Sequence, residues 1–396
     1  MITTMAAYGE KIKELLHRGV VEVIDAAHLE KRLLEERQLH VKLGVDPTSP
    51  DMHLGNAALL LKLRDFQELG HQAILIIGDF TGEIGDTSDK ESERPMLSKQ
   101  QVKSNMKTYV KQVKKVLHPR GLKIFYNSKW LAKMTFREIA QQANLFSLSD
   151  FIARTNIKMR IKSGSRISLR EVLYPLLQGY DSVKVKADVE IGATDQRFNM
   201  LAGRAMQQHF GQEPQDIIMM NLISGTDGKK MSKSRGNTIN ITDEPDIMFG
   251  KVMSIPDSLI LPYFIHCTRV SMQEIELYAR GLASNKISPR DVKTDLAYEI
   301  TKTFWGERHA AEARSWFIAV FRDKHIPEKI QEARLGGNTI TDALIRIGFA
   351  VSKSEARRLI EQRGIKIDGK AALDPDIIVR PGSVIQKGKR HFMRVI

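Results

Sequence analysis

The sequence predicts an α/β protein with a parallel-sheet domain, followed by a helical domain and a small α+β tail domain. Apolar runs of strand length alternate with helical periodicity up to about residue 242, and helical periodicity alone follows. Short strands return in the basic last part of the chain. The predicted divisions are an N-terminal helical segment at 1–38, the parallel-sheet domain at 39–242, the helical domain at 243–332 and the tail domain at 337–396.

The composition is typical of an ordinary soluble globular protein. Hydrophobic residues make up 42% and charged residues 27% of the 396. No apolar run approaches the roughly 20 residues that a membrane helix needs, and the first residues lack the apolar core of a secretory signal. The single cysteine, Cys267, excludes an intrachain disulfide and a cysteine zinc cluster, which fits a reducing cytoplasm.

In the first part of the chain, strand and helix patterns alternate. Residues 5–37 have helical periodicity with a break at Arg18, and 39–45 and 73–77 fit buried parallel strands. Between these strands, 56–70 has helical spacing and ends in a glycine suited to a C-cap. The later expected elements are a helix with a Ser98–Gln101 capping box, a strand at 123–127, a helix with a Thr135–Glu138 capping box, and strands at 187–192 and 216–223 separated by a helix.

From residue 243 the strand patterns stop. A glycine-containing stretch at 333–339 is a predicted linker before the tail. The tail is expected to contain two short helices, the second capped by Ser352 and Glu355, and four short strands. The expected helices before the tail are at 245–253, 271–282, 291–305 and 307–321, and the expected tail strands begin at Ile365, Ile377, Ser383 and His391.

The net charge of +14 allows two interpretations. One is a solvated, lysine-rich surface, and the other is a polyanionic partner. Residues 337–396 hold 12 basic and 6 acidic residues, so the tail is several times denser in positive charge than the average of the remaining chain. This distribution favours a polyanion-binding tail.

The loop from Asp46 to Asn56 lies between a predicted strand and a predicted helix. The helix N-terminus offers unpaired N–H groups and a partial positive charge, which suit a phosphate. Thr48 and His53 could add donors for a pyrophosphate leaving group, and Gly55 leaves room for an adenine ring against the backbone. The alternative is a loop with an ordinary cap and a surface histidine.

The segment from Gly228 to Asn237 holds three lysines and two serines between glycines. With almost no apolar side chain it cannot bury itself, so we expect a mobile loop. Mobile lysines suit a reaction whose charge develops late, because they can close on leaving phosphates in the transition state. The alternative is a solvated basic loop.

A predicted helix after Ser168 has a polar stripe beside its apolar one. Ser168 and Glu171 form a capping box. Tyr174, Gln178 and Asp181 follow at spacings of four and three residues, which places them on one line of the helix. Three hydrogen-bonding groups on one line could hold a small ligand, whereas the alternative is a solvated helix face.

The residues HLGN at 53–56 and KMSKS at 230–234 resemble the two signatures of class I aminoacyl-tRNA synthetases. The resemblance implies a Rossmann-like catalytic domain that binds ATP across both signatures and forms an aminoacyl-adenylate. Asn56 stands where the family usually has histidine. The ATP-binding residues that the resemblance implies are Asp46, Thr48, His53, Gly55, Asn56, Asp195, Lys230, Met231, Ser232, Lys233 and Ser234.

The polar stripe resembles the tyrosine-binding helix of tyrosyl-tRNA synthetases, and KLGVDPT at 42–48 resembles a bacterial subgroup of that family with a small RNA-binding tail. By resemblance, Tyr174 and Gln178 hold the α-ammonium group of tyrosine, and Asp181 accepts a hydrogen bond from the phenol. Lys42 replaces an aromatic residue that gives many relatives a second phenol contact. The tyrosine-binding residues implied are Lys42, Asp86, Tyr174, Gln178, Asp181 and Gln196.

The resemblance also implies a two-step reaction and its partners. The tyrosine carboxylate attacks the α-phosphate of ATP, and the tyrosyl group then passes to the 3′ end of tRNA(Tyr). The enzyme would catalyse the attack by positioning the reactants and stabilising charge. Mg²⁺ would be bound through the ATP phosphates, so no protein metal ligand, zinc or organic cofactor is expected. We expect a cytoplasmic homodimer, with part of its interface at 146–161, and no membrane partner. The catalytic residues implied are Thr48, His53, Lys90, Arg94, Lys230 and Lys233.

The tail resembles a small RNA-binding module of a ribosomal protein and of pseudouridine synthases. It implies contacts to structured RNA through Lys353, Arg357, Arg358 and Arg363. Two other classes of protein are possible interpretations of the sequence. The first is a different adenylate- or nucleotidyl-transferring enzyme, which the complete KMSKS segment and the tail disfavour. The second is an inactive RNA-binding paralogue, which the intact signature lysines disfavour.

Overall fold

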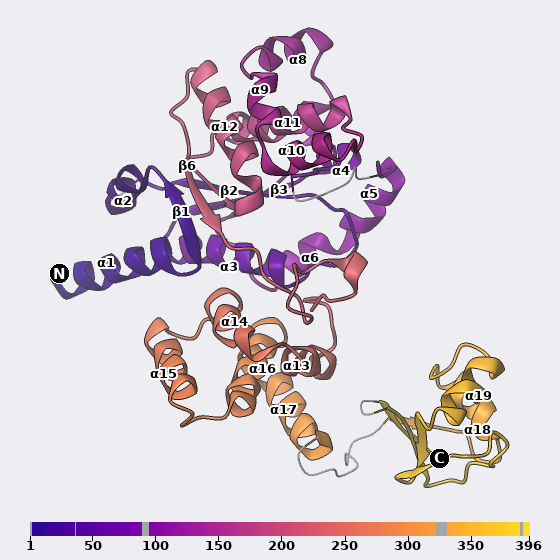
Figure 1. Ribbon diagram of the computed structural model, residues 1–396. Coiled ribbons are helices and arrows are strands. Elements are labelled where there is room, and N and C mark those ends of the chain that lie inside the picture. Colours follow the sequence, from indigo (N-terminus) through magenta and orange to yellow (C-terminus); the bar gives the residue numbers. More distant parts are fainter. Residues whose placement is uncertain (1, 36, 89–94, 322–330, 389–390) are drawn as a thin grey trace. The chain divides into compact units, whose positions relative to one another are not determined.

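The computed structural model of the protein describes residues 2–35, 37–88, 95–321, 331–388 and 391–396. The chain forms two compact units, Met1–Ala310 and Ala311–Ile396. The first unit holds a six-stranded sheet with helices on both faces and a further group of helices (Figure 1). No helix in these described ranges is both long and apolar enough to cross a membrane. The predicted divisions at residues 38 and 242, inside the first unit, stay predictions.

The sheet of the first unit has the strand order β1-β6-β5-β2-β3-β4. Strands β2 to β6 are parallel, and β1 is an antiparallel edge strand paired with β6. Every residue of β3, β5 and β6 is buried, as the apolar runs predicted. The strands are β1 (Val20–Ile24), β2 (His40–Val45), β3 (Gln72–Ile77), β4 (Leu122–Tyr126), β5 (Val189–Ala193) and β6 (Asp216–Met220).

Helices cover both faces of this sheet (Figure 1). Helix α3 (Leu54–Glu68) packs on one face against β2, β3 and β5, and α11 (Leu169–Val185) and α12 (Arg197–His209) lie on the other. The predicted capping boxes at the starts of α5, α8 and α11 are confirmed. The shorter helices are α4 (Thr81–Ile84), α5 (Lys99–Asn105), the 3₁₀ turn η1 (Met106–Thr108), α6 (Tyr109–Val113), α7 (Ser128–Leu131), α8 (Phe136–Ala143), α9 (Leu148–Ile152) and α10 (Thr155–Lys162).

The N-terminal segment is not helical throughout, so the prediction for 5–37 is wrong at its centre. Helices α1 (Ile2–His17) and α2 (Ala26–Leu34) flank strand β1. The sequence VVEVI of β1 is rich in β-branched residues, and pairing with β6 outweighs its helical periodicity. Gly19, with a φ of 67°, makes the turn between α1 and β1.

The further helices of the first unit follow β6. The predicted α13, α15, α16 and α17 are confirmed, and α14 was not predicted. The guanidinium of Arg18 donates to four carbonyl oxygens at and just beyond the end of α14, which ties this helix to α1. The helices are α13 (Pro245–Met253), α14 (Ile260–Cys267), α15 (Met272–Ala283), α16 (Pro289–Trp305) and α17 (Glu307–Phe321), which runs into the second unit.

The tail forms a five-stranded sheet in the order β7-β11-β10-β8-β9, with helices α18 and α19. Residues 333–339 were predicted as a linker, but Ala333 ends a strand that pairs with β11, and Leu335 is buried in the tail core. The strand predicted from Ile377 is also wrong, since this stretch forms only one isolated bridge. The tail elements are β7 (Gln331–Ala333), α18 (Ile340–Arg346), α19 (Lys353–Glu361), β8 (Ile365–Ile367), β9 (Lys370–Ala371), β10 (Val384–Lys387) and β11 (His391–Val395).

The close packing of α11 on α12 depends on Gly179. A Cβ atom there would lie 3.1 Å from the backbone carbon of Ala202 and 2.8 Å from the sulfur of Met206. Gly179→Ala should therefore lower the free energy of unfolding by about 1–3 kcal/mol, measured by urea denaturation. Gly9→Ala in α1 is the control, because a Cβ atom there has no neighbour within 4 Å. Equal stability of the two variants would contradict this account.

Candidate active site

A cleft of about 740 Å³ opens at the carboxyl ends of the parallel strands. It lies beside β2 and β5, where the strand order reverses direction, which is the usual ligand position in such sheets. The structure brings together there every predicted ATP- and tyrosine-binding residue. These are Lys42, Asp46, Thr48, His53, Gly55, Asn56, Asp86, Tyr174, Gln178, Asp181, Asp195, Gln196, Lys230, Met231, Ser232, Lys233 and Ser234. The predicted Lys90 and Arg94 lie outside the described residues.

His53 is the cap of α3 as well as a cleft residue. Its Nδ1 accepts from the backbone N–H of Gly55 at 3.1 Å, and the side chain of Asn56 accepts from the backbone N–H of His53 at 3.1 Å. Burial, and then the charges of Lys233 and Lys230, lower the pKa of His53 to about 4. The ring is therefore neutral at neutral pH, and because Nδ1 accepts, its proton is on Nε2.

The loop before α3 is held by side chains from α5, η1 and α6. Tyr109 donates to the carbonyl of Ser49 at 2.8 Å. Gln112 donates to the carbonyl of Pro50 at 2.9 Å and accepts from the N–H of Met52 at 2.7 Å. These bonds satisfy polar backbone groups of an irregular loop and so give the loop a defined shape.

The segment around Lys230 is fastened to the cleft wall, unlike the mobile loop that we predicted. The Nζ of Lys230 lies 3.1 Å from Oδ2 of Asp195. Lys233 donates to Oγ of Ser49 and to the carbonyl of Asp51. Met231 is buried, so the segment does anchor itself through its one apolar side chain. Lys233 consequently lies beside the loop that precedes α3, and Lys230 lies beside Asp195.

Asp181 is buried in the wall of the cleft. It accepts from Nε1 of Trp130 at 2.7 Å and from Nδ2 of Asn127 at 3.1 Å. Burial raises the pKa of Asp181 to about 7, against the opposing effects of Lys42 and the two donors. Asn127 and Trp130 were not predicted as site residues, although Asn127 is the last residue of the strand predicted at 123–127 and so lies at the carboxyl edge of the sheet.

The polar stripe of α11 faces the protein interior, so its interpretation as a solvated helix face is wrong. The hydroxyl of Tyr174 donates to Asp46 at 2.8 Å. Burial and the nearby carboxylates raise the pKa of Tyr174 well above its usual value, so it stays a donor. Asp86 accepts from Nε2 of Gln196 at 2.7 Å. These bonds position polar groups from four segments around one end of the cleft.

Lys42 is fully buried in the floor of the cleft and pairs with Glu190. Its Nζ lies 2.9 Å from Oε1 of Glu190 and donates to Oγ of Ser182 and to the backbone carbonyl of Gln178. Gln178 in turn donates through Nε2 to Oε1 of Glu190 at 3.1 Å. Glu190 was not predicted as a site residue, although it is an acidic residue in the middle of a buried strand.

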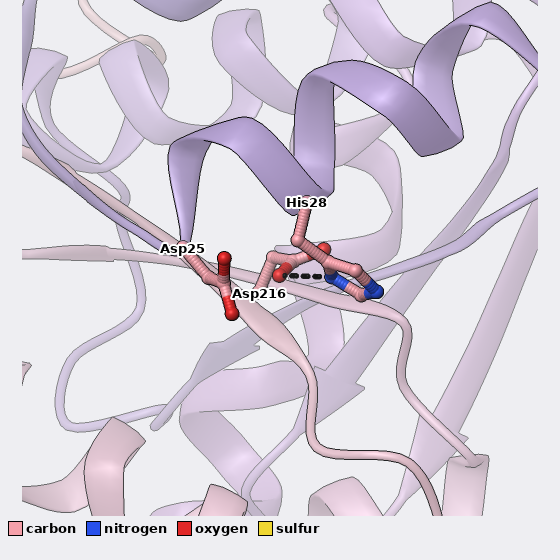
Figure 2. A group of neighbouring side chains, drawn as sticks. All are labelled: Asp25, His28 and Asp216. Atoms are coloured by element: carbon pink, nitrogen blue, oxygen red, sulfur yellow. Dashed lines mark hydrogen bonds and ion pairs between the residues drawn. The ribbon is translucent and has the colours of Figure 1, made fainter.

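A second group of ionisable residues lies away from the cleft. Figure 2 shows Asp25, His28 and Asp216, whose ligand atoms lie within 4.8 Å of one another. Nδ1 of His28 is 2.9 Å from Asp216, and Nη1 of Arg32 is 3.4 Å from the same carboxylate. The hydrogen bond to Asp216 raises the pKa of His28. These contacts tie α2 to β6.

In the tail, α19 and the turn after it expose basic side chains. Lys353 is partly neutralised by Asp342 at 3.0 Å. The residue that ends the turn, Arg363, has a φ of 56°. The predicted RNA-binding residues Lys353, Arg357, Arg358 and Arg363 are all exposed.

The chain belongs to the class I tRNA synthetases, because the family described as tRNA synthetases class I (W and Y) matches residues 34–322. An S4 domain matches residues 342–385. Within the class, the most similar proteins include tyrosine–tRNA ligases. The ligase of Thermotoga maritima is 46% identical, covering 98% of this chain and 97% of its own. Tyrosine–tRNA ligase 2 of Clostridium acetobutylicum is 44% identical, covering 98% of both.

Solved structures of tyrosyl-tRNA synthetases have a fold similar to that of this chain. A truncated mitochondrial tyrosyl-tRNA synthetase from Aspergillus nidulans has a TM-score of 0.66 at 18% identity, covering 81% of this chain and all of that one. The tyrosyl-tRNA synthetase of Archaeoglobus fulgidus, solved with L-tyrosine, has a TM-score of 0.62 at 19% identity, covering 78% and 99%. At these identities the likeness concerns the fold alone.

The state of His53 can be tested by nitrogen NMR of the labelled imidazole. We expect the Nε2–H form, with a pKa near 4. Lys233→Met should raise that pKa, because one neighbouring positive charge is removed while burial stays. Titration of the unaltered protein near the ordinary value of 6.5 would refute the assigned environment.

Proposed function

We propose that this chain is a tyrosine–tRNA ligase that forms tyrosyl-adenylate from tyrosine and ATP and transfers the tyrosyl group to tRNA(Tyr). The observation that carries the proposal is the single cleft in which the loop before α3, the Lys230–Ser234 segment and the polar stripe of α11 meet. One part of this cleft suits phosphates and the other suits a small polar amino acid. The full-length match to tyrosine–tRNA ligases supports the same reaction.

In the first step, the tyrosine carboxylate attacks the α-phosphate of ATP and pyrophosphate leaves. Thr48 and the Nε2–H of His53 donate to the leaving phosphates, and Lys230 and Lys233 neutralise the charge that develops on them. Mg²⁺, bound through the ATP phosphates, would supply further charge neutralisation. Lys90 and Arg94 are assigned to the same phosphates from sequence alone. Asp46, Gly55, Asn56, Asp195, Met231, Ser232 and Ser234 complete the nucleotide site.

Tyrosine is bound at the other end of the cleft. Tyr174, Gln178 and Asp86 bind its ammonium group, and Gln196 binds its carboxylate. Asp181 accepts from the phenol, with its position fixed by the donors Asn127 and Trp130. Phenylalanine would leave this buried acceptor short of a partner, which is the physical source of selectivity.

Lys42 acts on ammonium recognition rather than on the phenol. The Glu190 carboxylate accepts from Nε2 of Gln178, so the amide oxygen of Gln178 faces away from it. That oxygen accepts from Nδ2 of Asn199 at 3.1 Å and has a second lone pair with which to accept from the substrate ammonium. Lys42 pairs with Glu190 and is thus a positioning residue.

The second step brings the 3′ end of tRNA to the adenylate, with the basic face of the tail as an RNA contact.

The protein works as a homodimer in the cytoplasm, to which its single cysteine is suited. The dimer proposal is supported by apolar side chains on α8 to α11, such as Phe136 and Leu169, which are 85% and 83% exposed. Sedimentation as a monomer at micromolar concentration would refute the dimer.

Pyrophosphate exchange with each of the 20 amino acids in turn tests the proposed reaction. We expect exchange with tyrosine and little with phenylalanine or tryptophan. Charging of unfractionated tRNA with labelled tyrosine should follow, and omission of tRNA should leave exchange intact. Exchange with another amino acid, or with none, would overturn the proposal.

The pKa of Asp181 predicts how tyrosine recognition depends on pH. The ionised carboxylate accepts from the phenol, so the KM for tyrosine should rise about tenfold from pH 8 to pH 6 as the group with a pKa of about 7 protonates. Asp181→Ala should remove this dependence. It should also lower kcat/KM for tyrosine by a factor that corresponds to about 1–3 kcal/mol, with little effect on kcat/KM for phenylalanine. Equal losses for the two amino acids would show that Asp181 has only a structural role.

A further inference from the structure

The densest positive charge in the chain is outside the tail. Residues 95–137 contain 11 lysine and arginine residues and no aspartate or glutamate, whereas the whole chain has a net charge of +14. None of these basic residues belongs to the cleft or to the RNA-binding face of the tail. The proposed reaction therefore leaves the largest charge feature of the sequence without a role.

Much of this charge lies along one side of α5, η1 and α6, which follow one another at the edge of the first unit (Figure 1). Lys99 and Lys103 of α5 lie about 40° apart around the helix axis at 100° per residue, and Lys107 and Lys111 continue the same four-residue spacing through η1 and α6. The side chains that alternate with them, including Val102, Tyr109 and Val113, are buried against the protein. The exposed residues, which we call the lysine row, are Lys99, Lys103, Lys107, Lys111 and Lys114.

The lysine row does not stabilise the fold. Like charges four residues apart on a helix repel by a few tenths of a kcal/mol per pair. No acidic residue within 95–137 offsets this repulsion. A ligand with closely spaced negative charges would relieve this repulsion and bind favourably, since each lysine then neutralises an anion.

The row is also placed rigidly beside the phosphate end of the cleft. The buried side of the same helices holds the loop before α3 through Tyr109 and Gln112. Pro95, Leu97 and Tyr109 line the cleft itself. The helices therefore present their buried side to the nucleotide-binding loop and their lysines to solvent at the margin of the same site.

We propose that the lysine row is a second RNA-binding surface, which contacts the phosphate backbone of the tRNA whose 3′ end enters the cleft. This inference rests on the proposed function. Lysines act as point charges on phosphates without reading sequence, so the row would add affinity and orientation but no choice of tRNA. An anionic membrane fits less well, because membrane binding by an amphipathic helix needs an exposed apolar face, and that face is packed here.

A four-residue variant tests the row. Lys99, Lys103, Lys107 and Lys111 are changed together to glutamine, which keeps helix propensity. The matched control changes four exposed lysines elsewhere, Lys11, Lys31, Lys184 and Lys286, and so removes the same net charge. Both variants are compared with the unaltered protein in tyrosine-dependent pyrophosphate exchange, in binding of tRNA(Tyr) from 50 to 200 mM salt, and in thermal unfolding.

We expect the row variant to keep pyrophosphate exchange within twofold and to bind tRNA on the order of tenfold more weakly at 0.1 M salt. The slope of log affinity against log salt should become shallower by about 3, since each lost phosphate contact contributes about 0.7–0.9. The control variant should change the affinity less than threefold.

Three results would overturn the inference. Equal weakening by both variants would show an effect of net charge alone. Loss of pyrophosphate exchange in the row variant, with thermal unfolding unchanged, would place the lysines in the nucleotide site. Row-dependent binding to phosphatidylserine vesicles, with tRNA binding unchanged, would identify a membrane surface. Failure of the unaltered protein to exchange with tyrosine would instead refute the proposed function, while the binding comparison could still be read.

Discussion

The fixed shape of the loop between β2 and α3 is the constraint on which the site depends. The loop is irregular, so its backbone polar groups need partners outside regular structure. Tyr109 and Gln112 supply these from α6, and His53 closes the far end as the cap of α3. Because these bonds fix the loop, its donors would need little rearrangement in the reaction that we propose.

The two ends of the cleft use burial in opposite ways. Around His53, burial and neighbouring lysines keep the ring neutral, so that it can donate without adding a fixed charge. Around Asp181, burial makes the carboxyl group harder to ionise, although two donors hold its oxygens. Removal from water strengthens each of these interactions and raises the cost of any group left without a partner.

Much of the fold follows from periodicity in the sequence. The buried parallel strands are apolar runs, and the helix starts carry capping boxes, so both were predictable from neighbouring residues. Strand β1 was not predictable in this way, because its conformation depends on pairing with β6, nearly 200 residues further along the chain. The inclusion of residues 331–333 in the tail sheet has the same cause, since β7 pairs with β11 at the far end of the tail.

The candidate site shows the same division between local and distant causes. Short motifs and their resemblance to a known family were enough to select residues that gather in one cleft. They could not show that Asn127 and Trp130 hold Asp181, or that Glu190 is the partner of Lys42, because these contacts join segments between 50 and 150 residues apart. The fastening of Lys233 to Ser49 was hidden for the same reason.

The pairing of Lys42 with Glu190 has a consequence for how this protein can evolve. Loss of either member alone leaves a buried charge without its counterion, at a cost of about 3–5 kcal/mol, whereas joint replacement by neutral residues of similar volume can cost little. Stepwise mutation at position 42 therefore passes through an unstable intermediate. A change of Lys42 to an aromatic residue should therefore be accompanied by a change at position 190, so we expect the two positions to vary together.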